Sequence, residues 1–210
     1  MKNLVIITSI FYTANSIYNY QERICQIENS IISVRKKIPN SYIVLLEGGS
    51  AHTDDIIYFK SIVDEFITIN VTSLQKSVGE FTMLYTYLSG NTFQSKILEF
   101  GSISKLSGRY YLNNNFNFEK YSGQIVIKYR PDGNTLGVFE TRYYKMPIQY
   151  FPIFLNKLNI LSHDNIFMTS NVDIEHAFVN NNVFPIIGSI QNELIGISGN
   201  IAPDGTPIED

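Results

Sequence analysis

The chain has 210 residues, a length that suits a single domain with a core of its own. Hydrophobic residues make up 44% of it and aromatic residues 13%, which excludes an intrinsically disordered protein. The formal net charge of −3 argues against a nucleic-acid-binding protein, because such proteins carry an excess of basic residues. A single cysteine, Cys25, excludes an intrachain disulfide framework and a cysteine-rich zinc site. No apolar run reaches the roughly 20 residues of a membrane helix, so no transmembrane segment is expected.

The first residues allow two interpretations. Lys2 and the apolar residues after it loosely imitate a secretory signal peptide. The run from Leu4 to Ile7 is also typical of a buried first strand. We favour the strand, because the run is short, is broken by Thr8 and Ser9, and precedes a helical pattern at the spacing of a βα unit. A cytoplasmic protein is therefore expected.

Strand and helix patterns alternate over the first 110 residues. An apolar helix face is formed by residues three and four apart, namely Ile24, Ile27, Ile31, Val34 and Ile38. The continuous apolar run at 42–46 is typical of a strand buried on both faces. Further helices are predicted over 54–64, 77–88 and 92–100, and further strands over 66–69 and 103–107. This order predicts an α/β fold with a mostly parallel sheet flanked by helices.

The second half has a different pattern. Strands are predicted over 124–129 and 136–144, with a turn at 131–134 between them, and together they indicate a smaller hairpin. The sequence also predicts a helix from Pro147, a short helix over 173–179 and a last strand over 195–201. Residues 202–210 have the composition of a tail or linker, which suggests either a frayed terminus or further domains beyond them in a longer protein.

Candidate ligand contacts follow from the rule that ligands bind outside the carboxyl ends of strands in an open parallel sheet. Small hydroxyls there can pair with a base edge, a carboxylate can accept from a base or a ribose, and cations can neutralise a diphosphate. The residues with these properties are Thr8, Ser9, Glu47, Lys105, Ser107 and Arg109. Each also has a simpler explanation, such as a strand cap for Thr8 or a solvated turn for Glu47.

Several enzyme classes are disfavoured because their motifs are missing. The sequence contains no GxGxxG dinucleotide fingerprint, no GxxxxGK[ST] phosphate loop, no GxSxG elbow and no HExxH metal motif. Asp54 and Asp55 could hold a metal, but a helix N-terminus explains the two carboxylates equally well.

Four stretches of the chain carry a resemblance to a known family. They are the opening strand, KIPNSYIVLLE at 37–47, KLSGRYYL at 105–112 and ETRYYK at 140–145. Together they resemble small nucleotide-sugar glycosyltransferases of the GT-A fold, especially glycan-building domains of bacterial polysaccharide clusters and large DNA viruses.

The resemblance implies one glycosyltransferase domain with two halves. Residues 1–112 would bind the nucleotide sugar, and residues 113–201 would bind the acceptor and carry the catalytic base. The enzyme would move a sugar from a UDP- or dTDP-sugar to a hydroxyl of a glycan or glycoprotein.

The metal site of the family is where this sequence departs from the pattern. Many GT-A enzymes hold Mn²⁺ or Mg²⁺ on the diphosphate with an Asp-x-Asp motif after the fourth strand. Here the corresponding place has Ser107-Gly108-Arg109-Tyr110 and no pair of carboxylates. Either the metal is held elsewhere, or Lys105 and Arg109 stabilise the leaving diphosphate in its place.

A base is needed if the sugar is transferred with inversion. Glu175 is the first candidate, and Asp173 is the second because a helix N-cap would also explain it. Glu140 is the reserve candidate, although Arg142 shares its strand face and the two can simply form an ion pair. Arg142 and His176 are expected to contact the acceptor.

Two other functions stay open at this point. A catalytically silent nucleotide- or sugar-binding module of a larger glycan-assembly protein would also lack the Asp-x-Asp motif. A nucleotidyltransferase-like enzyme is the third reading, but the sequence has no glycine-rich phosphate loop for it.

Overall fold

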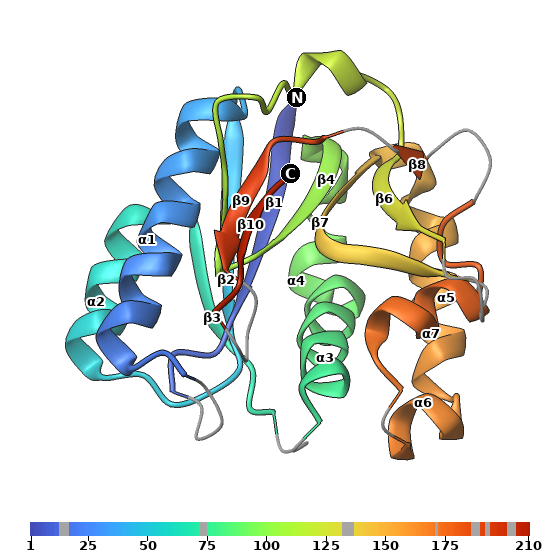
Figure 1. The fold of residues 1–210 in the computed structure, drawn as a ribbon, viewed down its shortest axis with the longest axis horizontal. Coiled ribbons are helices and arrows are strands. Elements are labelled where there is room, and N and C mark those ends of the chain that lie inside the picture. The colour runs from blue at the N-terminus through green and yellow to red at the C-terminus, as the bar shows by residue number, and fades with distance from the viewer. Residues whose placement is uncertain are drawn as a thin grey trace.

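A seven-stranded sheet forms the centre of the protein in the computed structural model (Figure 1). The structure describes residues 1–12, 17–71, 75–131, 137–170, 172–185, 190–191, 194–200 and 205–210. In sheet order the strands are β3 (Glu65–Thr68), β2 (Ser41–Glu47), β1 (Lys2–Ser9), β4 (Phe100–Ser107), β7 (Val138–Pro147), β6 (Val126–Arg130) and β8 (Ile190–Gln191). The first four are parallel, β7 is antiparallel to both of its neighbours, and β8 is parallel to β6. The predicted α/β fold with a mostly parallel sheet is confirmed.

Strand β1 lies in the middle of the parallel part and explains why the opening residues are so apolar. Leu4 to Ile7 have no exposed surface. Alternate residues of a strand point to opposite faces, so Leu4 and Ile6 belong to one core cluster while Val5 and Ile7 belong to the other. The interpretation of this segment as a buried strand is confirmed.

Helices cover both faces of the sheet (Figure 1). One face carries α1 (Tyr20–Lys37) and α2 (Thr53–Ile62), and the other carries α3 (Lys76–Ser89), α4 (Asn91–Gln94), α5 (Phe151–Ser162), α6 (Asn165–Thr169) and α7 (Ile174–Asn180). The short 3₁₀ helices are η1 (Ile97–Glu99), η2 (Glu119–Tyr121) and η3 (Ile148–Tyr150). No helix in the described part of the chain is both long enough and apolar enough to cross a membrane.

The predicted hairpin is formed by β6 and β7, but it continues the central sheet instead of standing apart as a separate element of the second half. Residues 132–136, which include most of the predicted turn and the predicted start of the second strand, lie outside the described residues. The predicted start of a helix at Pro147 is wrong, because Pro147 is the last residue of β7 and α5 begins at Phe151. Proline is tolerated at the end of a strand and in the first turn of a helix. Pro147 occupies the first kind of position in β7, and Pro152 occupies the second in α5.

A second, three-stranded sheet has the order β10–β9–β5, with β10 (Pro207–Glu209), β9 (Ile197–Asn200) and β5 (Tyr110–Leu112). It differs from the expected tail over 202–210, since residues 207–209 form a strand there. The Asp210 carboxylate accepts a hydrogen bond from Lys128 at 2.7 Å and from the backbone N–H of Ile195 at 3.2 Å. The described end of this segment is therefore packed against the domain.

Candidate functional site

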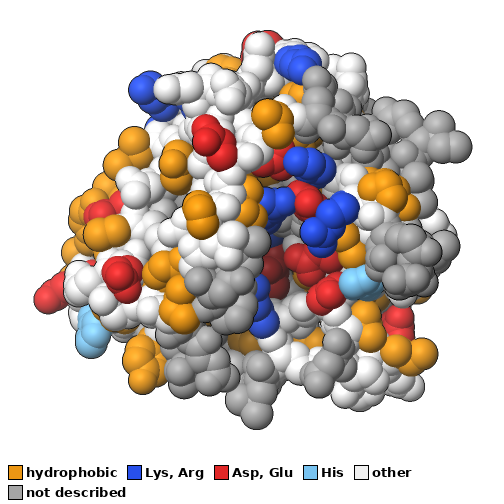
Figure 2. All heavy atoms as spheres, viewed as in Figure 1, with side chains coloured by type: hydrophobic (Ala, Val, Ile, Leu, Met, Phe, Trp, Pro, Cys, Tyr) orange, Lys and Arg blue, Asp and Glu red, His pale blue; other side chains and the backbone are white. Residues whose placement is uncertain are grey.

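A pocket of about 300 Å³ lies at the carboxyl end of β4, between α3, α7, β7 and the small sheet. Figure 2 shows basic and acidic side chains gathered around a hollow on this face of the molecule. Seven of the residues singled out in the sequence line it, namely Ser107, Arg109, Glu140, Arg142, Asp173, Glu175 and His176. They come from three separate segments of the chain, so the fold brings together the predicted catalytic and acceptor groups and part of the predicted donor set.

A β-bulge lets three consecutive residues of β7 reach this pocket. Ile127 and Lys128 are neighbours on β6, yet they pair with Tyr144 and Glu140 on β7. Three residues of β7, 141–143, therefore lie between two pairs that are adjacent on β6. In a regular strand, neighbouring side chains would alternate between the two faces, whereas here Glu140, Thr141 and Arg142 all line the pocket.

Lys105 is fully buried beneath the pocket, and its partners are all protein groups. Its ammonium donates to the hydroxyl of Ser107 at 2.6 Å and to the carbonyl of Thr141 at 2.7 Å, and it forms an ion pair with Glu80 of α3. A lysine has three donors, and these contacts use all of them. Lys105 as placed here supports the floor of the pocket, and direct contact with a diphosphate would require it to leave these partners.

Three arginines line the pocket, Arg109, Arg130 and Arg142, and two of them lie beside the ring of Tyr110. The guanidinium carbons of Arg109 and Arg142 are 5.6 and 5.9 Å from its centroid. Arg142 forms an ion pair with Glu140, which is the simpler explanation that the sequence left open for that pair. Arg109 is half-buried and forms no ion pair with any carboxylate among the described residues. It is therefore a cation that an anionic ligand could approach.

Glu175 lies in the first turn of α7 and faces the pocket. Its carboxylate accepts a hydrogen bond of 2.8 Å from the hydroxyl of Thr141. Burial and the nearby charge of Glu80 raise the pKa of Glu175. A raised pKa makes a carboxylate a better proton acceptor near neutral pH, which is the property that a general base needs.

Asp173 has the structural role that the sequence left open for it. It is the N-cap of α7: its carboxylate accepts from the backbone N–H of His176 at 2.8 Å and contacts Nδ1 of the same side chain at 2.7 Å. Among the pocket carboxylates, Glu175 is thus the one held by an uncharged hydroxyl, that of Thr141.

The remaining donor candidates lie apart from this pocket. Thr8, Ser9 and Glu47 are buried and do not line it. Strand alternation places Ser9 and Glu47 on the face covered by α1, whereas Lys105 and Ser107 point to the α3 face. The predicted donor set is therefore divided between two faces of the sheet.

Glu47 differs from the solvated turn residue that the sequence allowed, because it has no exposed surface. Its carboxylate accepts hydrogen bonds of 2.9 Å from the backbone N–H groups of Phe11 and Gly49. It thus links the segments that follow β1 and β2. Burial raises its pKa to about 7, although the two N–H groups oppose that shift.

Three charged residues of the pocket were missed in the sequence, namely Arg130 at the end of β6 and Lys76 and Glu80 of α3. Lys76 and Glu80 are four residues apart, the spacing that puts two side chains on one helix face. Glu80 is also the only carboxylate in α3, which is otherwise largely apolar. A lone acid in an apolar helix was the available signal, since such a residue needs a buried cation as partner.

A divalent cation does not fit the carboxylates of this pocket. Glu80 is paired with Lys105, Glu140 with Arg142, and Asp173 caps α7. Within the described ranges, no three His, Cys, Asp or Glu side chains are grouped so that they could hold a metal ion. The carboxylates that would hold Mn²⁺ or Mg²⁺ are thus occupied by partners within the protein.

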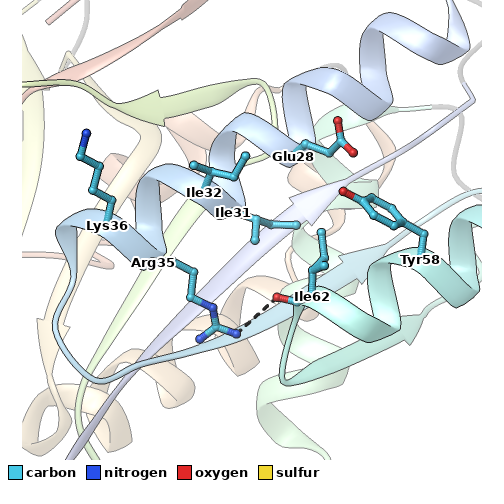
Figure 3. Close-up of a pocket in the computed structure, with 7 residues that line it drawn as sticks. All are labelled: Glu28, Ile31, Ile32, Arg35, Lys36, Tyr58 and Ile62. Carbon is cyan, nitrogen blue, oxygen red and sulfur yellow. Dashed lines mark hydrogen bonds between the residues drawn. The ribbon is translucent and has the colours of Figure 1, made fainter.

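Another hollow, of about 450 Å³, lies between α1 and α2 (Figure 3). Isoleucines line it, and Arg35 at its edge is bonded to the carbonyl of Ile62 at 3.4 Å and to Asp64 at 2.8 Å. This hollow offers apolar surface and lacks a convergent set of polar groups, so we assign no chemistry to it.

No protein-family model matches the chain, and no curated protein is similar enough to match it. The functional proposal therefore depends on the geometry of the pocket and on the resemblance seen in the sequence.

Proposed function

We propose that this protein is a glycosyltransferase of the GT-A type that moves a sugar from a UDP- or dTDP-sugar to a hydroxyl of a glycan acceptor. The observation that supports the proposal is that Arg109, without a carboxylate partner among the described residues, and Glu175, with a raised pKa, line the same pocket at the carboxyl end of β4. Arg109 can bind an anionic group, and Glu175 can accept a proton.

The reaction needs stabilisation of a leaving diphosphate. The acceptor oxygen attacks the anomeric carbon, and the bond from that carbon to the diphosphate oxygen breaks, so negative charge grows on the diphosphate. Arg109 and Lys76 supply positive charge at the pocket, and Arg142 supplies a guanidinium already oriented by Glu140. Preorganised cations of this kind stabilise developing charge without waiting for solvent to reorganise.

The reaction also needs a base for the acceptor hydroxyl. Glu175 takes that proton in the proposed mechanism, which fits transfer with inversion of the anomeric carbon. Thr141 holds the carboxylate through its hydroxyl, and the other three carboxylates of the pocket are committed to Lys105, Arg142 and the cap of α7. The cytoplasmic location predicted from the sequence stays part of this proposal.

Donor hydrolysis tests the proposal directly. The wild-type protein is incubated with UDP- and dTDP-sugars in the absence of acceptor, and release of the nucleoside diphosphate is measured. We expect slow release that Arg109→Ala abolishes. Tight nucleotide binding with no release from any donor would favour the silent binding module instead. Absence of both binding and release would contradict the proposal.

A further inference from the structure

The small sheet lies beside α1 (Figure 1). Residues of the small sheet and of α1 line a polar groove. It is made of two hollows of about 600 and 570 Å³, which share Asn29, Tyr111, Ser198 and Glu209. The second hollow also shares Arg109 and Ile208 with the candidate site. The groove therefore leads from the candidate site towards the C-terminal end of α1.

The register of the small sheet places an aromatic ring in the middle of this groove. Tyr111 pairs with Ser198, and Ser198 pairs with Glu209, so the three residues form one row across the sheet. The neighbours of Tyr111 on β5, Tyr110 and Leu112, are buried, whereas Tyr111 itself is 41% exposed. The pleat therefore turns the Tyr111 ring outward into the groove.

Six amide side chains line the groove, namely Gln26, Asn29, Asn113, Asn114, Asn115 and Asn200. They outnumber the four charged side chains, which are Lys36, Lys37, Arg109 and Glu209. An amide both donates and accepts hydrogen bonds, and so does a hydroxyl. A groove lined in this way matches a ligand that carries many hydroxyl groups and little charge.

Part of this lining is held in place and part is free to bind. Asn113 donates to the hydroxyl of Ser198 at 2.9 Å and accepts from the backbone N–H of Asn115 at 2.8 Å. By contrast, no hydrogen bond between described residues uses the side chains of Asn29, Tyr111 or Asn200. The exposed ring and these amides can therefore bind a ligand without breaking internal contacts.

We propose that this groove binds the acceptor as an extended neutral oligosaccharide. One sugar ring lies on the face of Tyr111, because a sugar has an apolar C–H face that suits an aromatic ring, and its hydroxyls pair with the surrounding amides. The end of the chain reaches the candidate site past Arg109. The direction in which the oligosaccharide runs, with its end at the candidate site, rests on the proposed function. Binding of the oligosaccharide in the groove does not depend on catalysis.

The absence of tryptophan from the sequence allows a direct test. Tyr111→Trp keeps an aromatic platform and introduces the only tryptophan of the protein. Its emission is followed while neutral oligosaccharides of glucose, galactose, mannose, rhamnose and N-acetylglucosamine are added. We expect a saturable change with at least one of them. Tyr58→Trp is the matched control, because Tyr58 lies on α2, is 43% exposed and is outside the groove.

A second pair of variants separates the ring from non-specific effects. Calorimetry with the responding oligosaccharide should give at least a tenfold loss of affinity for Tyr111→Ala, and wild-type affinity for Tyr58→Ala. The inference is overturned if no oligosaccharide changes the emission of Tyr111→Trp, or if Tyr111→Ala binds as tightly as the wild type.

Donor hydrolysis distinguishes failure of this inference from failure of the proposed function. Tyr111→Ala should hydrolyse the donor at the wild-type rate in the absence of acceptor, because Tyr111 does not line the candidate site. Hydrolysis without oligosaccharide binding overturns the groove alone. Oligosaccharide binding without hydrolysis supports the groove and contradicts the enzymatic function.

Discussion

The hydroxyl of Thr141 donates a hydrogen bond of 2.8 Å to Glu175, and the backbone carbonyl of Thr141 accepts one of 2.7 Å from Lys105. One residue of the β7 bulge thus connects the buried cation under the pocket with the carboxylate in its wall. The position and the pKa of Glu175 therefore depend on the backbone conformation of β7. This relationship makes Thr141 a positioning residue for Glu175.

Glu175→Gln should lower turnover by about 10²–10⁴ and leave donor affinity nearly unchanged, because a positioned general base contributes about that much. The two side chains are nearly equal in size, so lost packing would not explain a large effect. Single-turnover transfer and equilibrium binding of the nucleoside diphosphate are the measurements. Asp173→Asn is the control, since asparagine is also a good N-cap. Wild-type turnover in Glu175→Gln would remove the residue from catalysis.

The pH dependence of the rate should report the raised pKa of Glu175. A base acts only when it is deprotonated, so kcat/KM should fall as the pH drops through a value above the ordinary range of glutamate. Thr141→Val removes a hydrogen bond that favours the ionised carboxylate, so this acid limb should move to higher pH. An unchanged profile in Thr141→Val would mean that the hydrogen bond does not tune the base.

Arg109→Ala should weaken binding of the nucleoside diphosphate about ten- to a hundredfold and leave binding of the free nucleoside nearly unchanged. A charge-assisted hydrogen bond contributes about 1.5–3 kcal/mol, and 1.4 kcal/mol corresponds to a factor of ten. Lysine should rescue only part of the loss, because it lacks the bidentate fork of arginine. Arg35→Ala is the control on the opposite face of the sheet. Equal losses for both ligands would indicate a structural role for Arg109.

Removal of divalent metal should leave donor hydrolysis largely unchanged, because cations already neutralise the carboxylates Glu80 and Glu140. The comparison is the rate in EDTA against the rate in added Mn²⁺ or Mg²⁺. A tenfold or larger stimulation by either metal would show that these ion pairs rearrange when the donor binds.

Glu80→Gln should destabilise the fold by about 3–5 kcal/mol, because it leaves the fully buried ammonium of Lys105 without its carboxylate. The double variant Lys105→Met, Glu80→Leu should recover most of that loss, since it removes both charges and keeps apolar volume. The free energy of unfolding of each variant is measured in urea. If the single and the double variant are equally stable, Lys105 and Glu80 are not coupled as their geometry indicates.

Glu47 should make the protein less stable as the pH rises. Its folded-state pKa of about 7 lies above its ordinary value of 4.5, so the folded protein holds the proton more tightly than the unfolded chain. Stability from this group is present below pH 4.5 and is lost between 4.5 and about 7, by about 3 kcal/mol for that shift. The free energy of unfolding, measured in urea at pH 5 and at pH 7.5, should differ less between the two pH values for Glu47→Gln than for the wild type. An equal difference in the two proteins would contradict the raised pKa of Glu47.

Local sequence patterns determined most of the first half of the fold. The apolar steps of three and four at Ile24, Ile27 and Ile31 and the continuous run at 42–46 predicted α1 and β2, because helix and strand periodicity depend on neighbouring residues alone. Residue chemistry also picked out Arg109 as a cation after a strand, and the resemblance to GT-A enzymes picked out Glu175. The sequence by itself thus indicated the fold class and the types of group in the pocket.

Tertiary structure decided which of these groups meet. Pairing of β9 with β5 joins residues that are far apart in the chain, such as Tyr110 with Gly199, and no local pattern encodes such a partner. The bulge in β7 turns Thr141 towards Glu175, and the parity of β2 turns Glu47 away from Lys105 and into the α1 face. Strand register and face are fixed by long-range hydrogen bonding and by burial of whole apolar faces, so they depend on the assembled sheet and are not written in any single segment.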